Sequence, residues 1–140
     1  MNLLFLDSIE KGTYGGMEEW IRLVAGGLAS RGHLTLVAGR VGSELLRRVR
    51  ASGVDTLEIK ISGDFNPFTV MRLRRIIEER QIDCVCVNFN KDIRLGGLAA
   101  RLTGSVPVIW SVGLDITGKS WVHRHLTPQL VDSVIVPSES

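Results

Sequence analysis

The chain has 140 residues, of which 44% are hydrophobic and 23% charged, and its formal net charge is +2. These values are ordinary for a soluble globular domain with one core, and so small a charge does not by itself indicate a nucleic-acid-binding protein. No apolar run approaches the roughly 18 residues that cross a membrane, and the N-terminus lacks the basic segment of a signal peptide, so we expect a cytoplasmic protein.

The first half of the chain alternates short apolar runs with amphipathic segments. We predict strands at residues 2–7, 33–38 and 54–61, and helices at residues 16–31 and 44–52. Gly32 and Gly53 follow the two helices and predict their ends, and Ser43 is placed to cap the second. On the first helix Glu18 and Arg22 are four residues apart, a spacing at which opposite charges pair.

The second half continues the alternation. We predict strands at residues 82–88, 106–112 and 132–136, and helices at residues 67–80, 92–103 and 119–130. The apolar run between Asp83 and Asn88 is typical of a parallel strand covered on both faces. The whole pattern predicts an α/β fold, a doubly wound, Rossmann-like parallel sheet with helices on both faces.

The end of the chain looks unfinished. A predicted strand is followed there by Pro137-Ser138-Glu139-Ser140, a run typical of the start of another helix. No internal repeat, low-complexity tract or linker divides the chain. We therefore expect residues 1–140 to form one domain of a longer protein.

Neither the cysteines nor the histidines predict a metal site. Cys84 and Cys86 share one face of a predicted strand, too extended for an ordinary disulfide, and are typical of core thiols in a reducing compartment. On a helix His123 and His125 lie about 200° apart, so one metal ion cannot readily use both. We interpret them, with Trp121, as packed or solvated helix residues.

Three glycines, Gly12, Gly15 and Gly16, separate the first strand from the first helix, at the sheet edge where ligands bind in such folds. Their spacing fits neither the dinucleotide fingerprint nor a P-loop. Glu18 and Glu19 in the first helical turn oppose a phosphate placed directly on that terminus. Two interpretations stay open, a simple turn and a loop that lets a substrate approach backbone N–H groups.

The run YGGMEEWIRLVAGGLASRGHLTLVAG resembles the start of retaining family 4 glycosyltransferases of the GT-B type. In that family a first strand leads into a Gly-Gly-x-Glu loop, and an Arg-Gly-His turn enters the second strand. Here the matching residues are Gly15, Gly16 and Glu18, and residues 31–33. The similarity continues through RLRRIIEERQIDCVCVN, GGLAARLTGSVPVIWSV and VDSVIVPSES, so it spans essentially the whole chain.

The resemblance implies the N-terminal, acceptor-side half of a two-domain enzyme whose C-terminal, donor-binding half is absent from this chain. The full enzyme would transfer a sugar from a nucleotide diphosphate sugar to a glycan or lipid-linked acceptor, in cell-envelope polysaccharide or lipopolysaccharide synthesis, without a metal or cofactor. The backbone at Gly15 and Gly16 would approach the donor phosphates or the transferred sugar. The isolated chain would be inactive.

The chain also departs from the family. Cys86 and Asn88 stand where the family often has His-x-His, and Gly113 lies nearest the place of a histidine that touches the transferred sugar. Retaining transfer in this family is usually ascribed to the donor phosphate itself taking the acceptor proton, so no catalytic side chain is assigned.

Residues that open the first helix, or that lie at or after the ends of the fourth and fifth strands, are candidates for binding acceptor hydroxyls. They are Glu18, Asn88, Asn90, Lys91, Asp92, Ser111, Gly113 and Asp115. The alternative for Asn90 and Asp92 is that they only cap the next helix.

Two amphipathic helices carry clustered arginines. These are Arg47, Arg48 and Arg50 on the first, and Arg72, Arg74, Arg75 and Arg80 on the second. Such helices could rest on an anionic membrane surface, or could simply be solvated faces. The basic positions lack interleaved aromatic residues, which argues against nucleic acid as a partner.

Two further functions stay open. A non-enzymatic doubly wound module, such as a response-regulator receiver, needs an acidic cluster after the first strand and a lysine after the fifth. The chain offers only Asp7 and residues 111–113 there. A sugar-nucleotide epimerase of GT-B architecture is the other, and product analysis would distinguish it from a transferase.

Overall fold

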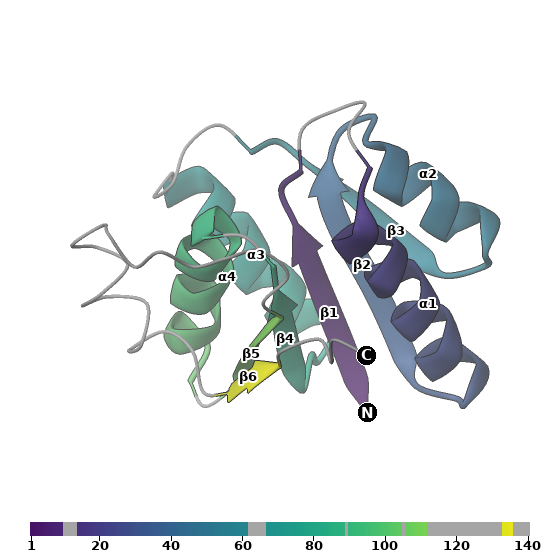
Figure 1. Cartoon of the computed structure of the whole chain (residues 1–140). Helices are drawn as coiled ribbons and strands as arrows, with labels where there is room; N and C mark the ends of the chain where they lie inside the picture. The colour runs from purple at the N-terminus through teal and green to yellow at the C-terminus, as the bar shows by residue number, and fades with distance from the viewer. Residues whose placement is uncertain (10–13, 62–66, 89, 105, 112–132, 136–140) are drawn as a thin grey trace.

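The computed structural model of the chain describes residues 1–9, 14–61, 67–88, 90–104, 106–111 and 133–135 (Figure 1). Its elements in chain order are β1 (Asn2–Asp7), α1 (Gly16–Ser30), β2 (Leu34–Arg40), α2 (Glu44–Ala51), β3 (Asp55–Ile59), α3 (Pro67–Glu79), β4 (Cys84–Val87), α4 (Asn90–Leu102), β5 (Val108–Ser111) and β6 (Ser133–Ile135). Every predicted element is found except the helix at residues 119–130, which lies outside the described residues.

The strands form one six-stranded parallel sheet in the order β3-β2-β1-β4-β5-β6, which confirms the predicted doubly wound fold. β1 is central, because Leu4 lies opposite both Leu36 of β2 and Val85 of β4. On one side of β1 lie β2 and then β3, and on the other side lie β4, β5 and β6. Sheets of this kind bind ligands beyond the carboxyl ends of the strands at the point of reversal, here between β1 and β4.

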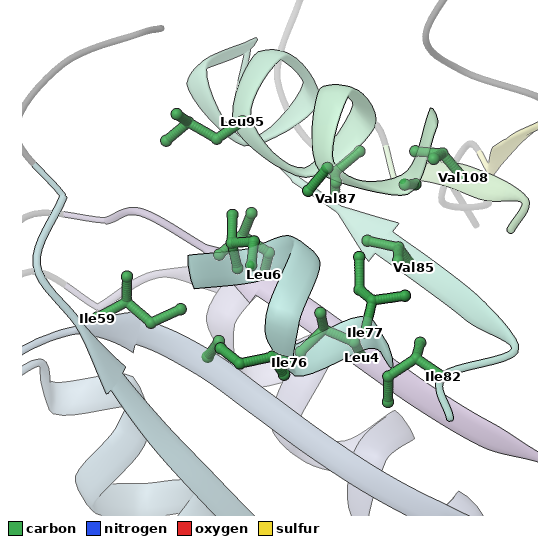
Figure 2. Packing of buried hydrophobic residues seen from close by; sticks show 14 of the residues in the cluster. Leu4, Leu6, Ile59, Ile76, Ile77, Ile82, Val85, Val87, Leu95 and Val108 are labelled. Carbon is green, nitrogen blue, oxygen red and sulfur yellow. The ribbon is translucent and has the colours of Figure 1, made fainter. Parts of the chain in front are cut away.

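Helices cover both faces of the sheet (Figure 1). α3 and α4 lie over one core, to which β1 contributes Leu4 and Leu6 (Figure 2). α1 and α2 cover the other core, to which β1 contributes Leu3 and Phe5. Successive residues of β1 therefore enter opposite cores, as expected of a strand buried on both faces.

The cap of α2 and the glycines that end α1 and α2 lie where the sequence predicts them. The backbone N–H of Leu46 donates to the Ser43 hydroxyl oxygen at 3.1 Å, which caps α2. Gly32 follows α1 with a φ of 90°, and Gly53 follows α2 with a φ of 84°. Glycine adopts this left-handed backbone conformation without the steric cost that a Cβ brings.

The two cysteines are core thiols outside any disulfide, as predicted. Cys84 is buried and Cys86 half-buried, within the core that α1 and α2 cover. A hydrogen bond with the Cys84 side chain, and then burial, raise the pKa of the Cys86 thiol well above its usual range. These effects favour a protonated Cys86 thiol at neutral pH.

The two arginine-rich helices present different surfaces. The apolar residues of α2 are buried, and Arg47 and Arg48 both pair with Glu44. On α3, in contrast, Phe68 is 85% exposed and Met71 is 51% exposed. In the part of the chain that the structure describes, no helix is both long and apolar enough to cross a membrane.

Candidate functional site

The carboxyl ends of β1 and β4 lie side by side, because Leu6 is opposite Val87 in the parallel register. Asp7 ends β1 and Asn88 follows β4. The Asn88 Nδ2 donates a hydrogen bond to Asp7 Oδ2 at 2.8 Å. Since α1 and α4 also begin near these strand ends, four elements meet at the reversal point of the sheet.

Gly15 and Gly16 form an exposed turn at the beginning of α1. The Gly15 N–H donates to Glu18 Oε1 at 2.9 Å. The Gly15 backbone is extended, with a φ of −138° and a ψ of −165°, which any residue can adopt. A Cβ on Gly16 would meet nothing within 4 Å, and one on Gly15 only Glu18 Oε1 at 3.4 Å. Among the described residues, neither backbone conformation nor packing requires glycine here.

Three buried carboxyl groups adjoin this turn. Asp7 of β1 and Asp92 of α4 are 0% exposed, and Glu18 of α1 is 3% exposed. Asp7 Oδ1 also accepts a hydrogen bond from the Ile9 N–H at 2.8 Å. Burial, followed by the charge of Asp92 and the hydrogen bond and charge of Glu18, raises the pKa of Asp7 to about 9. Burial and the neighbouring carboxylates therefore favour the neutral form of Asp7.

The ion pair predicted between Glu18 and Arg22 is replaced by one between Glu19 and Arg22. The Arg22 Nε donates to Glu19 Oε2 at 3.1 Å, and its Nη2 donates to Glu19 Oε1. Glu18 instead turns inward to the Gly15 N–H and to Asp7. The third residue of a helix can reach back to the N-cap backbone in this way, and burial then removes Glu18 from the solvated face.

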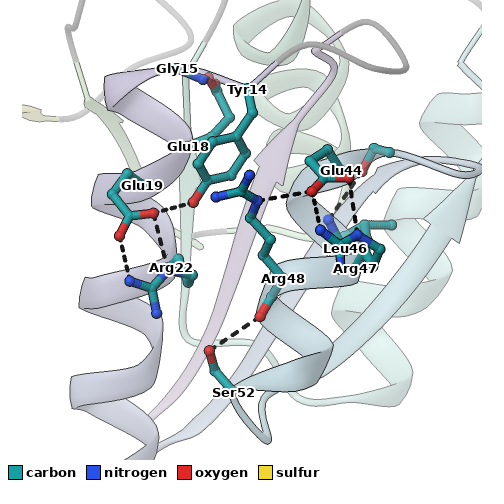
Figure 3. Close-up of polar contacts among 11 residues, drawn as sticks. Tyr14, Gly15, Glu18, Glu19, Arg22, Glu44, Leu46, Arg47, Arg48 and Ser52 are labelled. Atoms are coloured by element: carbon teal, nitrogen blue, oxygen red, sulfur yellow. Dashed lines mark hydrogen bonds and ion pairs between the residues drawn. The ribbon is translucent and has the colours of Figure 1, made fainter.

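Tyr14 connects the glycine turn to α1 and α2 (Figure 3). Its hydroxyl donates to Glu19 Oε2, and the Arg48 guanidinium carbon lies 4.1 Å from the centroid of its ring. Hydrogen bonds from Arg22 and then from Tyr14 lower the pKa of Glu19 to about 2. The ring and the hydroxyl of Tyr14, which precedes the glycines, are therefore both fixed by contacts with α1 and α2.

Arg40, the last residue of β2, connects the loops that follow β1 and β3. Its Nε donates to the Ser8 carbonyl and its Nη1 to the Ile61 carbonyl, both at 2.8 Å. Carbonyl groups that leave a sheet edge need such donors when they are buried. Asp7, Tyr14 and Arg40 were missed as site residues, and the only available signal was their place at a strand end or beside the glycines.

The other predicted site residues differ in where they lie. Asn88 is 9% exposed, and its carbonyl oxygen accepts a hydrogen bond from Trp110 Nε1 at 3.1 Å. Three more occupy the first turn of α4 or the end of β5, with no side-chain position described: Asn90, Lys91 and Ser111. Gly113, Asp115, Trp121, His123 and His125 lie outside the described residues.

The structure brings Glu18, Asn88 and Asp92 together with Asp7 in one buried cluster. The described ranges contain no group of three or more histidine, cysteine, aspartate or glutamate side chains that could hold a metal ion. The buried cluster is a set of hydrogen-bonding and proton-sharing groups.

Comparison with known families matches residues 14–140 to Glycosyltransferase Family 4. The sequence matches no curated protein closely enough to name a relative.

Several solved structures share the fold at low sequence identity. MurG from Acinetobacter baumannii superposes with a TM-score of 0.73 at 19% identity, over 99% of this chain and 42% of MurG. HepE from Anabaena, in complex with UDP and glucose, gives 0.67 at 18% identity, over 91% of this chain and 34% of HepE. UDP-GlcNAc 2-epimerase from Neisseria meningitidis, bound to UDP-GlcNAc, gives 0.70 at 16% identity, over 99% of this chain and 40% of the epimerase. The chain thus spans less than half the length of the proteins that it resembles.

Proposed function

This chain belongs to Glycosyltransferase Family 4, and from that membership we propose that it is the acceptor-side domain of a retaining, GT-B type glycosyltransferase. The whole enzyme transfers a sugar, as a hexosyltransferase, from a nucleotide diphosphate sugar to a glycan or lipid-linked acceptor. A second, C-terminal domain binds the donor. We place the enzyme in the cytoplasm, in the synthesis of a cell-envelope glycan.

The observation that carries this proposal is the exposed glycine turn at the reversal point of the sheet. A Cβ on Gly16 would point into open space, so glycine serves no packing need among the described residues of this domain. Glycine leaves room for a ligand to approach the backbone, and the first N–H groups of a helix lack intrahelical partners. A donor phosphate or sugar held by the second domain would meet the turn from this open side.

The charges around the turn are compatible with an anionic donor. Glu19, in the first turn of this helix, forms an ion pair with Arg22 and accepts a hydrogen bond from the Tyr14 hydroxyl. Glu18 is buried, and its carboxylate is turned toward the Gly15 N–H. The pairing with Arg22 therefore weakens the opposition of Glu19 to a phosphate at this helix terminus.

The experiment that tests the proposal compares the longer protein with residues 1–140 in assays with labelled nucleotide diphosphate sugars and glycan or lipid-linked acceptors. We expect sugar transfer by the longer protein and none by residues 1–140, because donor and acceptor would then lack a shared site. Turnover by residues 1–140 alone would contradict the two-domain proposal.

A second candidate function, sugar-nucleotide epimerisation, is supported by the shared fold with UDP-GlcNAc 2-epimerase. The same assay separates the two functions, because an epimerase releases a free epimer and a transferase yields a glycoside. A free epimer formed in the absence of any acceptor would favour the epimerase.

We also propose that the outer face of α3 contacts an anionic membrane surface. Phe68 and Met71 are exposed there, with the exposed Arg72 and Arg75 at helical spacing from them. Apolar side chains beside cations are the combination that binds an anionic lipid interface. The enzyme would then bind a lipid-linked acceptor at the membrane that contains it.

Replacing Phe68 and Met71 together with serine is expected to lower binding to mixed phosphatidylcholine and phosphatidylglycerol vesicles by about tenfold or more, since each loses buried apolar area. Vesicle sedimentation measures this change. Leu23→Ser is the control, because Leu23 is 59% exposed but lies on α1. Equal losses in the two proteins would contradict a contact made by α3.

A further inference from the structure

One carboxylate oxygen of Glu18 receives no hydrogen bond from any N–H group or hydroxyl of the described residues. Glu18 Oε1 accepts a hydrogen bond from the Gly15 N–H, and the oxygen left over is the buried Oε2. The side chain in hydrogen-bonding contact with Glu18 is that of Asp7. Two carboxyl groups in such contact need one proton between them, because each is otherwise only an acceptor.

The surroundings assign this proton to Asp7. Glu18 lies in the first turn of α1, where the helix dipole favours a negative charge, and it already accepts an N–H group. Asp7 is fully buried, and Asp92 of α4 adds a second negative charge close to it. Burial and these two carboxylates raise the pKa of Asp7 to about 9.

The groups on the other elements around Asp7 do not reverse this assignment. Arg40 of β2 donates to the Ser8 and Ile61 carbonyls. On β4, Asn88 is a neutral amide, and the Cys86 thiol has a pKa raised above its usual range. The Ile9 N–H and the Asn88 amide both donate to Asp7 and act in the opposite direction, but burial and the two carboxylates outweigh them.

We propose that Asp7 is a positioning residue that acts as a neutral carboxylic acid. Its proton is donated to Glu18, and the Glu18 carboxylate fixed in this way holds the Gly15 N–H and with it the exposed glycine turn. That the turn then faces a sugar donor rests on the proposed function. The protonation of Asp7 and the anchoring of the turn do not.

The pH dependence of folding follows from this proton. In the unfolded chain Asp7 loses its proton near its ordinary pKa of 3.8, whereas the folded chain keeps it up to about pH 9. Between these values the folded state binds one more proton than the unfolded state, so stability falls as the pH rises. Above the folded-state pKa, ionised Asp7 faces Glu18 and Asp92 and the hold on the turn is lost.

The test compares the wild-type chain with Asp7→Asn. The amide introduced by this substitution can donate to Glu18 as the acid does. Asn88 Oδ1 has no donor among the described residues, so the Asn88 amide can turn and accept a hydrogen bond from the new amide through this oxygen. In the wild type, Asp7 contributes a loss of about tenfold in the folding equilibrium constant per pH unit from about pH 5 to pH 8. We expect this contribution to vanish in Asp7→Asn and to persist in the control Asp55→Asn, since Asp55 is exposed on β3.

Two spectroscopic readouts separate protonation from a merely structural role. The wild type should show the infrared carbonyl band of a carboxylic acid at neutral pH, and Asp7→Asn should lack it. The Gly15 amide resonance should titrate with a midpoint near pH 9 in the wild type and not in Asp7→Asn, with Gly27 as the unaffected reference. An absent acid band, or a Gly15 resonance that behaves alike in both proteins, would overturn the inference. Neither readout needs sugar transfer, so failure of the proposed function would leave both results intact.

Discussion

Replacing Gly16 with valine is expected to lower kcat/KM for sugar transfer in the longer protein by about 100-fold. Gly16 is the first residue of α1, it is exposed, and a Cβ there would enter open space. The new side chain would stand on the side from which we propose that the donor approaches. Displacing the donor by about the width of a methyl group misaligns the reacting atoms, whereas the fold of this domain is expected to be unaffected. Steady-state kinetics and denaturant unfolding of the same variant measure the two effects.

The matched control is Gly27→Val, on the same helix. Gly27 is also exposed and a Cβ there also meets nothing within 4 Å, but it lies about three turns away from the glycine turn. We expect kcat/KM to be unchanged in this variant. Equal losses at both positions, or a loss at Gly16 that follows a fall in stability, would show that the glycine turn does not face the donor.

Replacing Gly96 with valine should destabilise the domain by about 3 kcal/mol or more. Gly96 of α4 packs closely against side chains of β1 and β4. A Cβ on Gly96 would lie 3.1 Å from both Leu6 Cδ2 and Val87 Cγ1. Leu6 and Val87 are each 1% exposed and belong to the core that α3 and α4 cover (Figure 2). Valine would push α4 off the sheet, because neither neighbour has free volume to move into.

Urea unfolding measures this loss, with Gly27→Val again as the control. At Gly27 the same substitution adds a side chain in open space, so a change of less than about 0.5 kcal/mol is expected. A Gly96→Val protein as stable as the wild type would mean that α4 can withdraw from β1 and β4 without cost. The buried position of Asp92, one turn earlier on α4, depends on the same close packing.

The elements of this fold could be predicted because their signals are local. The apolar run of β4 favours a strand buried on both faces. The glycines after α1 and α2 favour the left-handed backbone conformation that ends a helix. Gly32 and Gly53, for example, were predicted to end helices, and both have the positive φ that favours glycine. The boundaries differ by a few residues, as with β2, which continues to Arg40 rather than ending at residue 38.

The interior of the site could not be predicted, because it depends on strand order. Alternating strands and helices are compatible with more than one order of parallel strands. The observed order places β4 beside β1 and so brings Asn88 to Asp7, whereas the other common doubly wound order would separate them. In the sequence Asp7 merely ends an apolar run, and Glu18 looks like an exposed helix residue. The contact between Tyr14 and Arg48 likewise depends on how α1 and α2 pack.

The central place of β1 has a consequence for how the chain folds during synthesis. Its partner β2 is complete at Arg40, but its other partner begins only at Cys84, which is 44 residues later. At roughly 5–20 residues per second, one edge of β1 stays unpaired for about 2–9 s while the ribosome makes the intervening segment. Open strand edges invite pairing with other chains, and a charge at the edge opposes it. On the protonation proposed above, Asp7 is ionised in the unfolded chain and neutral in the fold, so the nascent strand carries its protective charge only until β4 and α4 bury it.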